Sequence, residues 1–273
     1  MPRAGGFTAA LQVLFAGTIL APFGLMILGA MSDNSHLLRG DIFHPNPANL
    51  AANLGAVVSQ TNNSSFATAL INSTILSALM VIFQLSSSVL AAYGFAYFDF
   101  KHKKFIYRAL LCSYLVPPVA TITPLFFVTA AIGLKETALG VVLPYLLFSP
   151  YALAALRIKF EGISQSFLDQ AIIDGVGPWQ LLLRIVIPIS APFIGIIGLV
   201  TFVSMWNSYL WPRLISGNGF PTVTVALGAM QGQYTANLNL VLTGALLALI
   251  PSISAFAITQ KHLVAGFMEE IQE

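Results

Sequence analysis

Long apolar stretches separated by short clusters of charged residues dominate this chain. No Asp, Glu, Lys or Arg occurs between Arg3 and Asp33, or between Arg213 and Lys261. A helix that crosses a bilayer needs about 20 apolar residues, so such stretches mark membrane spans. The pattern predicts six spans, at about 9–31, 67–97, 105–131, 138–156, 183–212 and 239–260.

The charge-free stretch between Asp41 and Asp99 is too long for a single span. Its first part contains Pro45, Pro47 and a polar run over 60–65, which are typical of a loop. The second span therefore begins near residue 67. Residues 32–66 and 214–238 are polar and rich in turn-forming residues, and they are predicted to form exposed loops. The whole chain, residues 1–273, is predicted to be one all-α, polytopic transmembrane domain.

Composition supports a membrane protein. Hydrophobic residues make up 57% of the chain and charged residues 8%, and the mean hydropathy is +0.82. Soluble domains carry roughly 25% charged residues. The sequence therefore excludes an ordinary soluble enzyme and a nucleic-acid-binding protein. The net charge of +2 is too small to indicate an anionic partner, and a single cysteine, Cys112, excludes internal disulfides and cysteine-ligated metal clusters.

Basic residues near the span ends predict the orientation in the membrane. With a cytoplasmic N-terminus, nine basic residues face the cytoplasm and three face outward, as the positive-inside rule favours. A cleaved signal peptide over residues 1–31 is the alternative, but it would leave five spans with the opposite bias. Both termini are therefore expected in the cytoplasm. The inner residues are Arg3, Lys101, Lys103, Lys104, Arg108, Arg157, Lys159, Arg184 and Lys261, and the outer ones are Arg39, Lys135 and Arg213.

The longest cytoplasmic segment, residues 157–184, differs from its surroundings. Ser166 and Asp169 have the spacing of a capping box, which predicts a short helix beginning at Ser166. Gly175 is expected to end that helix. Pro178 stands where a new helix can begin, since its missing N–H costs nothing at the first helical position.

The short helix is predicted to be amphipathic. A helix lying on lipid headgroups would favour Lys and Arg on its polar face. The polar face here is acidic and neutral, which favours docking in a groove of another protein, with the lipid-surface helix as the alternative. The apolar residues on one face are Phe167, Leu168, Ala171 and Ile172, and the polar flank consists of Asp169, Gln170 and Asp174.

The same segment carries a longer motif. Asp169-Gln170-Ala171, three residues, Gly175, nine residues and then Ile185-Val186-Ile187-Pro188 resembles the EAA loop of binding-protein-dependent ABC importer permeases. The stretches 174–180, 188–192 and 206–212 resemble the carbohydrate-uptake branch of that family, which includes maltose-type permeases. The stretch 206–212 and the polar run 62–65 also resemble glycerol-3-phosphate permeases.

The resemblance implies a type I ABC importer permease fold with a cytoplasmic coupling helix in a loop at about 161–178. It also implies a bacterial or archaeal cytoplasmic membrane and three kinds of partner: a second homologous permease in a heterodimer, two ATP-binding cassette subunits and an extracytoplasmic substrate-binding protein. The sequence departs from the motif at Asp169, where Glu is usual, and at Gln170, where Ala is usual; Asp169 keeps the negative charge with a side chain one methylene shorter. The residues implied in ATPase coupling are Phe167, Leu168, Asp169, Gln170, Ala171, Ile172, Asp174, Gly175 and Pro188.

The chain is expected to have no catalytic residues, cofactor or metal of its own. It lacks the Gly-x-x-x-x-Gly-Lys-Ser/Thr sequence of a P-loop, so ATP and Mg²⁺ are expected on the partner ATPase. Its four histidines, His36, His44, His102 and His262, are spread over predicted outer and inner loops. The predicted function is import of a sugar, a polyol or a glycerol-3-phosphate-type solute.

Substrate contacts are expected from polar and aromatic residues in the spans, where unpaired polar groups are costly. Amide, hydroxyl and aromatic groups suit sugars and polyols. Such side chains also bridge helices or lie at membrane interfaces, and Trp211 is interpreted as an interface anchor. The candidates are Gln84, Trp206, Asn207 and Tyr209, with Arg213 as a partner for a phosphate group.

An ion-coupled secondary transporter or a channel that acts without an ATPase is the alternative. It would need internal repeats, broken spans that meet at the midplane, or an ionisable pair within the membrane. The sequence shows no isolated charge at mid-depth of a predicted span, and this alternative leaves the acidic cytoplasmic helix unexplained.

Overall fold

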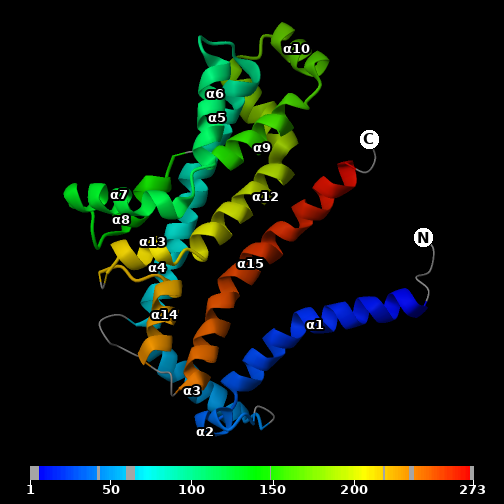
Figure 1. Cartoon of the computed structure of the whole chain (residues 1–273). Coiled ribbons are helices and arrows are strands. Elements are labelled where there is room, and N and C mark those ends of the chain that lie inside the picture. The colour runs from blue at the N-terminus through cyan, green and yellow to red at the C-terminus, as the bar shows by residue number, and fades with distance from the viewer. Residues whose placement is uncertain are drawn as a thin grey trace. The chain divides into compact units, whose positions relative to one another are not determined.

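The computed structural model describes residues 6–41, 44–59, 65–147, 149–217, 219–233 and 237–270 (Figure 1). Within these ranges all regular secondary structure is helical, which confirms the all-α prediction. Most of the predicted polar loop 60–65 lies outside them. The helices are α1 (Gly6–Ala30), α2 (Asn34–Leu38), α3 (Pro47–Ser59), α4 (Phe66–Met80), α5 (Ser86–Tyr97), α6 (Lys103–Tyr114), α7 (Pro118–Ala131), α8 (Ala138–Val142), α9 (Pro150–Glu161), α10 (Gln165–Ile173), α11 (Pro178–Leu181), α12 (Ile187–Trp206), α13 (Leu210–Ile215), α14 (Val223–Gln233) and α15 (Leu238–Glu270).

Three further helical segments join some of these helices. Val81–Leu85 is π-helical and joins α4 to α5, and Leu182–Val186 is π-helical and joins α11 to α12. Leu143–Tyr145 is a short 3₁₀ turn after α8. The second π segment ends two residues before Pro188, which has no N–H and whose ring would clash with the carbonyl four residues earlier in a regular α-helix. A wider turn at this point removes that conflict.

Four helical stretches are long and apolar enough to cross a membrane, and they correspond to the first, second, fifth and sixth predicted spans. The two remaining predicted spans are bent pairs of helices, so the described residues provide four spans, or six when each bent pair counts as one. The four long stretches are Thr8–Ala30, Phe66–Tyr97, Pro178–Trp206 and Leu238–Gln260.

The third predicted span, 105–131, is broken rather than continuous. Helices α6 and α7 meet at 96°. Pro117 and Pro118 explain the break, because a proline disfavours the helical conformation of the residue before it and itself fits best at a helix start. Pro118 begins α7. The fourth predicted span bends by 46° between Ala138–Tyr145 and Pro150–Glu161, where Pro150 begins α9.

Contacts within the chain divide it into two compact units. The smaller one contains the described residues up to Leu70 together with Val225–Ile250, and the larger one contains Ile71–Thr224 and the described residues from Pro251 onward. In the smaller unit, buried amides join three helices. The Asn53 side chain of α3 donates to the Ala30 carbonyl (2.8 Å) and accepts from the Asn239 side chain of α15 (2.9 Å).

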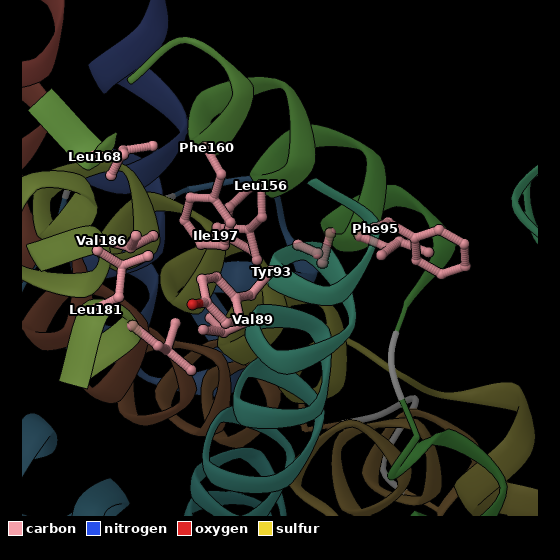
Figure 2. Packing of buried hydrophobic residues seen from close by; sticks show 13 residues of the cluster. Val89, Tyr93, Phe95, Leu156, Phe160, Leu168, Leu181, Val186 and Ile197 are labelled. Carbon is pink, nitrogen blue, oxygen red and sulfur yellow. The ribbon is translucent and has the colours of Figure 1, made fainter. Parts of the chain in front are cut away.

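The main core of the larger unit lies between α5, α9 and the start of the Pro178–Trp206 helix (Figure 2). Phe160 and Leu156 of α9 are fully buried there, with Val186 and Ile197 from the long helix opposite them. Leu168 of α10 belongs to the same cluster. The core therefore connects the short helix α10 directly to two of the membrane-spanning stretches.

A second core in the larger unit surrounds Trp211. This side chain is 3% exposed, and its indole N–H donates to the Val141 carbonyl at 3.0 Å. Its ring also contacts Tyr145 edge to face, with centroids 6.2 Å apart. The interpretation of Trp211 as a membrane-interface anchor was wrong, because the ring packs within the protein. The other buried residues of this cluster are Leu76, Met80, Val141, Val142, Met205 and Ile215.

Candidate functional site: helix α10 and a polar helix end

Helix α10 occupies the position predicted for the short helix, but its start differs. The N-cap is Ser164 rather than Ser166, and no side chain caps the free N–H groups. The expected capping box is therefore wrong. Ser164 and Ser166 instead bond to each other through their hydroxyls (2.8 Å), and Asp169 accepts a hydrogen bond from the Gln165 side chain (2.9 Å).

The end of α10 confirms the role predicted for Gly175. This residue has φ +82°, in the left-handed region that favours glycine. Its N–H donates to the Ile172 carbonyl at 3.0 Å, and the Val176 N–H donates to the Ala171 carbonyl at 3.1 Å. The two bonds form a Schellman motif, which satisfies carbonyls that a helix end otherwise leaves unpaired. The chain can then turn sharply toward Pro178.

The apolar residues of α10 divide between two environments. Leu168 is fully buried, and Ala171 is half-buried against the main core of the larger unit. Phe167 and Ile172 are about half exposed, at 49% and 55%, and Ile173 is 84% exposed. One side of the helix therefore anchors it to its own chain, while the other side presents apolar surface outward, at the end of the larger unit (Figure 1).

Negative charge flanks the exposed side of α10. Asp169, Gln170 and Asp174 are exposed. Within the described part of the chain, neither aspartate forms an ion pair. The exposed end of the helix therefore combines apolar surface with two solvated negative charges.

The helix that follows begins as predicted. Gly177 is its N-cap and Pro178 its first residue. Trp179, next in the chain, is 67% exposed and adds aromatic surface after α10. The continuous stretch runs from Pro178 to Trp206, so Pro188 lies inside it, at the second position of α12, rather than at its start.

Two tyrosines on α5 contact the chain on either side of this loop. The Tyr93 hydroxyl donates to the Pro178 carbonyl at 2.8 Å, and the Tyr97 hydroxyl donates to the Phe160 carbonyl at 2.5 Å. Their rings meet edge to face with centroids 5.3 Å apart. The sequence analysis missed both residues. Their only signals were their spacing of four residues and their place just before the charged turn at Asp99, which also suits aromatic residues at a membrane interface.

Of the predicted substrate-pathway residues, Gln84 and Trp206 have structural roles. The Gln84 amide lies in the π-helical segment Val81–Leu85 and donates to the Tyr145 carbonyl at 2.7 Å. Trp206 is 3% exposed and stacks on Phe202, with centroids 5.8 Å apart. The Gln84 side chain therefore joins two helical segments of the larger unit, whereas the Trp206 ring packs against its own helix, α12.

The other three lie together in sequence at the end of α12. Asn207 is the C-cap of that helix, Tyr209 is the N-cap of α13, and Arg213 is on α13. All three side chains are exposed. Among the described residues, none of the ion pairs involves Arg213. An amide, a phenol and a guanidinium are therefore exposed at nearby positions of the chain where the long helix ends.

Two of the histidines that the sequence analysis treated as scattered lie close together. His44 Nε2 is 3.1 Å and His36 Nδ1 is 3.5 Å from one Asp41 carboxylate oxygen. Their rings are 5.6 Å apart. Among the described residues, no group of three or more His, Cys, Asp or Glu side chains is placed to share a metal ion.

Comparison with known proteins places these features in context. Residues 84–265 match the family described as "Binding-protein-dependent transport system inner membrane component". The matched region contains α10, the tyrosine contacts and the end of α12.

Individual relatives are named as permeases for sugars or for a glycerol phosphate. The arabinooligosaccharides transport system permease protein AraQ of Bacillus subtilis (strain 168) is 27% identical and covers 90% of this chain and 88% of its own. The trehalose transport system permease protein SugB of Mycobacterium tuberculosis is 30% identical over 74% of this chain and 75% of its own. The sn-glycerol-3-phosphate transport system permease protein UgpE of Yersinia pestis bv. Antiqua is 27% identical over 92% and 91%.

Solved structures agree on the fold. A chain of a bacterial ABC transporter involved in the import of the acidic polysaccharide alginate superimposes with a TM-score of 0.74 over 96% of this chain and 99% of its own, at 21% identity. A chain of a bacterial alginate ABC transporter in complex with its pentasaccharide-bound periplasmic protein gives a TM-score of 0.63 over 93% of both, at 14% identity. At these identities the likeness concerns the fold.

Proposed function

Because the chain belongs to the family of binding-protein-dependent transport system inner membrane components, we propose that it translocates a sugar or related solute into the cytoplasm. Members of this family are non-catalytic, multi-pass permease subunits. In the proposed function, a partner ATPase docks on α10 and drives the transport. The observation that supports docking is that one side of α10 is buried, while the other side is apolar, exposed and flanked by acidic residues.

Docking is supported by the free-energy cost of leaving the exposed apolar surface of α10 uncovered. Phe167, Ile172 and Ile173 expose apolar surface next to two carboxylates, a combination that suits neither a lipid interior nor an anionic headgroup layer. A groove with an apolar floor and a basic rim would cover both features. Because Leu168 is buried in the permease core, movement of the docked helix would be passed on to the membrane-spanning stretches.

The proposed solute class rests on the relatives and on the exposed polar residues. Arabinooligosaccharides, trehalose and sn-glycerol-3-phosphate are the solutes in the relatives' names. Asn207, Tyr209 and Arg213 are better placed to contact such solutes than Gln84 and Trp206, whose side chains are engaged within the protein. Arg213 is the residue suited to a phosphorylated solute, since its guanidinium can bind two phosphate oxygens.

The proposed assembly contains a second permease, two ATP-binding cassette subunits that hold ATP and Mg²⁺, and a soluble substrate-binding protein. With α10 facing those ATPase subunits, both chain termini lie in the cytoplasm, in agreement with the bias of basic residues. An assembly of this kind leaves all nucleotide chemistry to the partner subunits.

Affinity purification of the tagged chain from its native membrane tests the proposal. We expect a second permease, a P-loop ATPase and a soluble receptor to accompany it. Replacement of Phe167 and Ile172 by Ala should release the ATPase, whereas replacement of Ile158, which is 69% exposed on α9, should not. Recovery of the chain without an ATPase, together with transport by the chain alone in liposomes lacking ATP, would favour an ion-coupled secondary transporter or channel instead.

A further inference from the structure

The loop that carries α10 is held to helix α5 at both of its ends by the same kind of contact. Tyr97 bonds to Phe160, next to the end of α9, and Tyr93 bonds to Pro178, the first residue of the next helix. The coupling loop, residues 161–178, runs between these two points. We propose that the tyrosine pair, Tyr93 and Tyr97, are positioning residues that make α5 and α10 move as one body; this inference rests on the proposed function.

The two carbonyls differ in what else they bind. Phe160 lies in the last turn of α9, where carbonyls lack partners four residues ahead, and its oxygen also accepts from the Ile163 N–H. The Pro178 carbonyl accepts from the Leu182 N–H within its own helix. Each tyrosine hydroxyl therefore adds a side-chain hydrogen bond to a helix-end carbonyl that also accepts from the backbone, and this bond ties that end to α5.

The burial of Tyr93 makes its hydrogen bond important, because a buried hydroxyl cannot bond to water instead. Tyr93 is 6% exposed and its hydroxyl points toward the side of the core formed by Leu181 and Val186 (Figure 2). A buried phenol needs a partner for its O–H, so phenylalanine would fill the same space without making the bond. The edge-to-face contact between the rings fixes the two hydroxyls relative to each other. Packing alone would hold the loop against the core, while the hydroxyls fix its position along α5.

The mechanical consequence is specific. A helix attached only by Leu168 and its apolar neighbours can rock about that contact when a partner pulls on it. Two bonds at the loop ends, one on each side of α10, oppose such rocking. ATPase movement would then reach the membrane-spanning stretch Phe66–Tyr97 directly through α5, in addition to the route along the chain into Pro178–Trp206.

The test uses the purified complex in nanodiscs and the variants Tyr93→Phe, Tyr97→Phe and the pair together. Tyr151→Phe is the matched control, because this tyrosine is 44% exposed on α9 and its hydroxyl makes no hydrogen bond within the described residues. Spin labels are placed at Leu90→Cys on α5 and Ser166→Cys on α10, both exposed and neither on the proposed docking face, in a chain that carries Cys112→Ser. The distance distribution between the labels is measured with and without ATP and vanadate.

We expect one narrow distribution in the otherwise unchanged chain, the same in both nucleotide states. Loss of each hydrogen bond should raise the population of displaced loop positions about fivefold, so the double variant gives a broad, nucleotide-dependent distribution. ATP hydrolysis without receptor should rise in parallel. The single variants carry the test should the double variant not assemble.

An unchanged distribution in the double variant, or equal broadening in Tyr151→Phe, overturns the proposal. Failure of the proposed function would look different: no ATPase would be present in the purified complex, while the distances between the labels would still report on the tyrosine pair.

Discussion

At the scale of single residues, backbone geometry and hydrogen bonding decide which positions in the coupling loop tolerate change. Gly175 has φ +82° and Gly177 has φ −71°, although neither glycine has an atom within 4 Å of an added Cβ. Backbone conformation, and not the space for a methyl group, therefore distinguishes the two positions. Sequence predicted the helix stop at Gly175 because glycine is the usual residue in that conformation.

Replacement of Gly175 by Ala should destabilise the end of α10 by about 1–2 kcal/mol, the cost of a left-handed residue with a Cβ. The Schellman motif would loosen, and ATP-driven uptake should fall. Gly177→Ala is the control, because alanine adopts its φ without strain and its poorer N-cap preference affects the start of α11 rather than the end of α10. It should leave the end of α10 intact and lower uptake less than Gly175→Ala. Thermal unfolding and uptake by the two variants check this. Equal effects of the two substitutions would show that the conformation of Gly175 is not important.

Arg213 gives a prediction that concerns the solute. Its guanidinium is exposed at the end of the long helix, and a charged hydrogen bond to phosphate is worth about 1.5–3 kcal/mol. Arg213→Ala should therefore raise KM for glycerol-3-phosphate by about tenfold or more and leave uptake of a neutral disaccharide unchanged. The exposed Arg39, replaced by Ala, is the control. Unchanged uptake of the phosphorylated solute would remove Arg213 from the pathway.

At the scale of elements, the sequence predicted where helices occur better than where they bend or what they contact. The charge-free stretches and the short helix near Gly175 were clear from spacing. Pro117 and Pro118 carried the signal for the break between α6 and α7, but hydropathy over 105–131 concealed it. The burial of Leu168 beside the exposure of Phe167 depends on packing against α5 and α9, which no local pattern of α10 can specify.

The division of α10 predicts two distinct mutant phenotypes. Leu168→Ala should lower the free energy of unfolding by about 2–5 kcal/mol, because it leaves a cavity in the core. Phe167→Ala should leave stability almost unchanged and weaken association with the ATPase. Thermal unfolding and co-purification separate the two effects. The division would be contradicted by a stable Leu168→Ala variant or by a strongly destabilised Phe167→Ala variant.

At the scale of the whole molecule, membrane insertion and family membership follow from features spread over most of the chain. The low content of charged residues and the positions of the spans could be predicted directly from the sequence, and the motif from Asp169 to Pro188 identified the family. The tyrosine pair could not be found in this way, because each hydroxyl bonds to a carbonyl more than 60 positions away in the chain. The same holds for Gln84, whose amide looked free for solute until its bond to Tyr145 placed it between helices.

The most direct test of the account is photo-crosslinking from α10 in the intact membrane. A photoreactive amino acid replaces Ile172, which is 55% exposed on the outward side of the helix, and in a control it replaces Phe105, which is 72% exposed on α6. The account predicts a crosslink from position 172 to a P-loop ATPase and none from position 105. A crosslink from position 172 to lipid alone, with no ATPase adduct under conditions that support uptake, would contradict it.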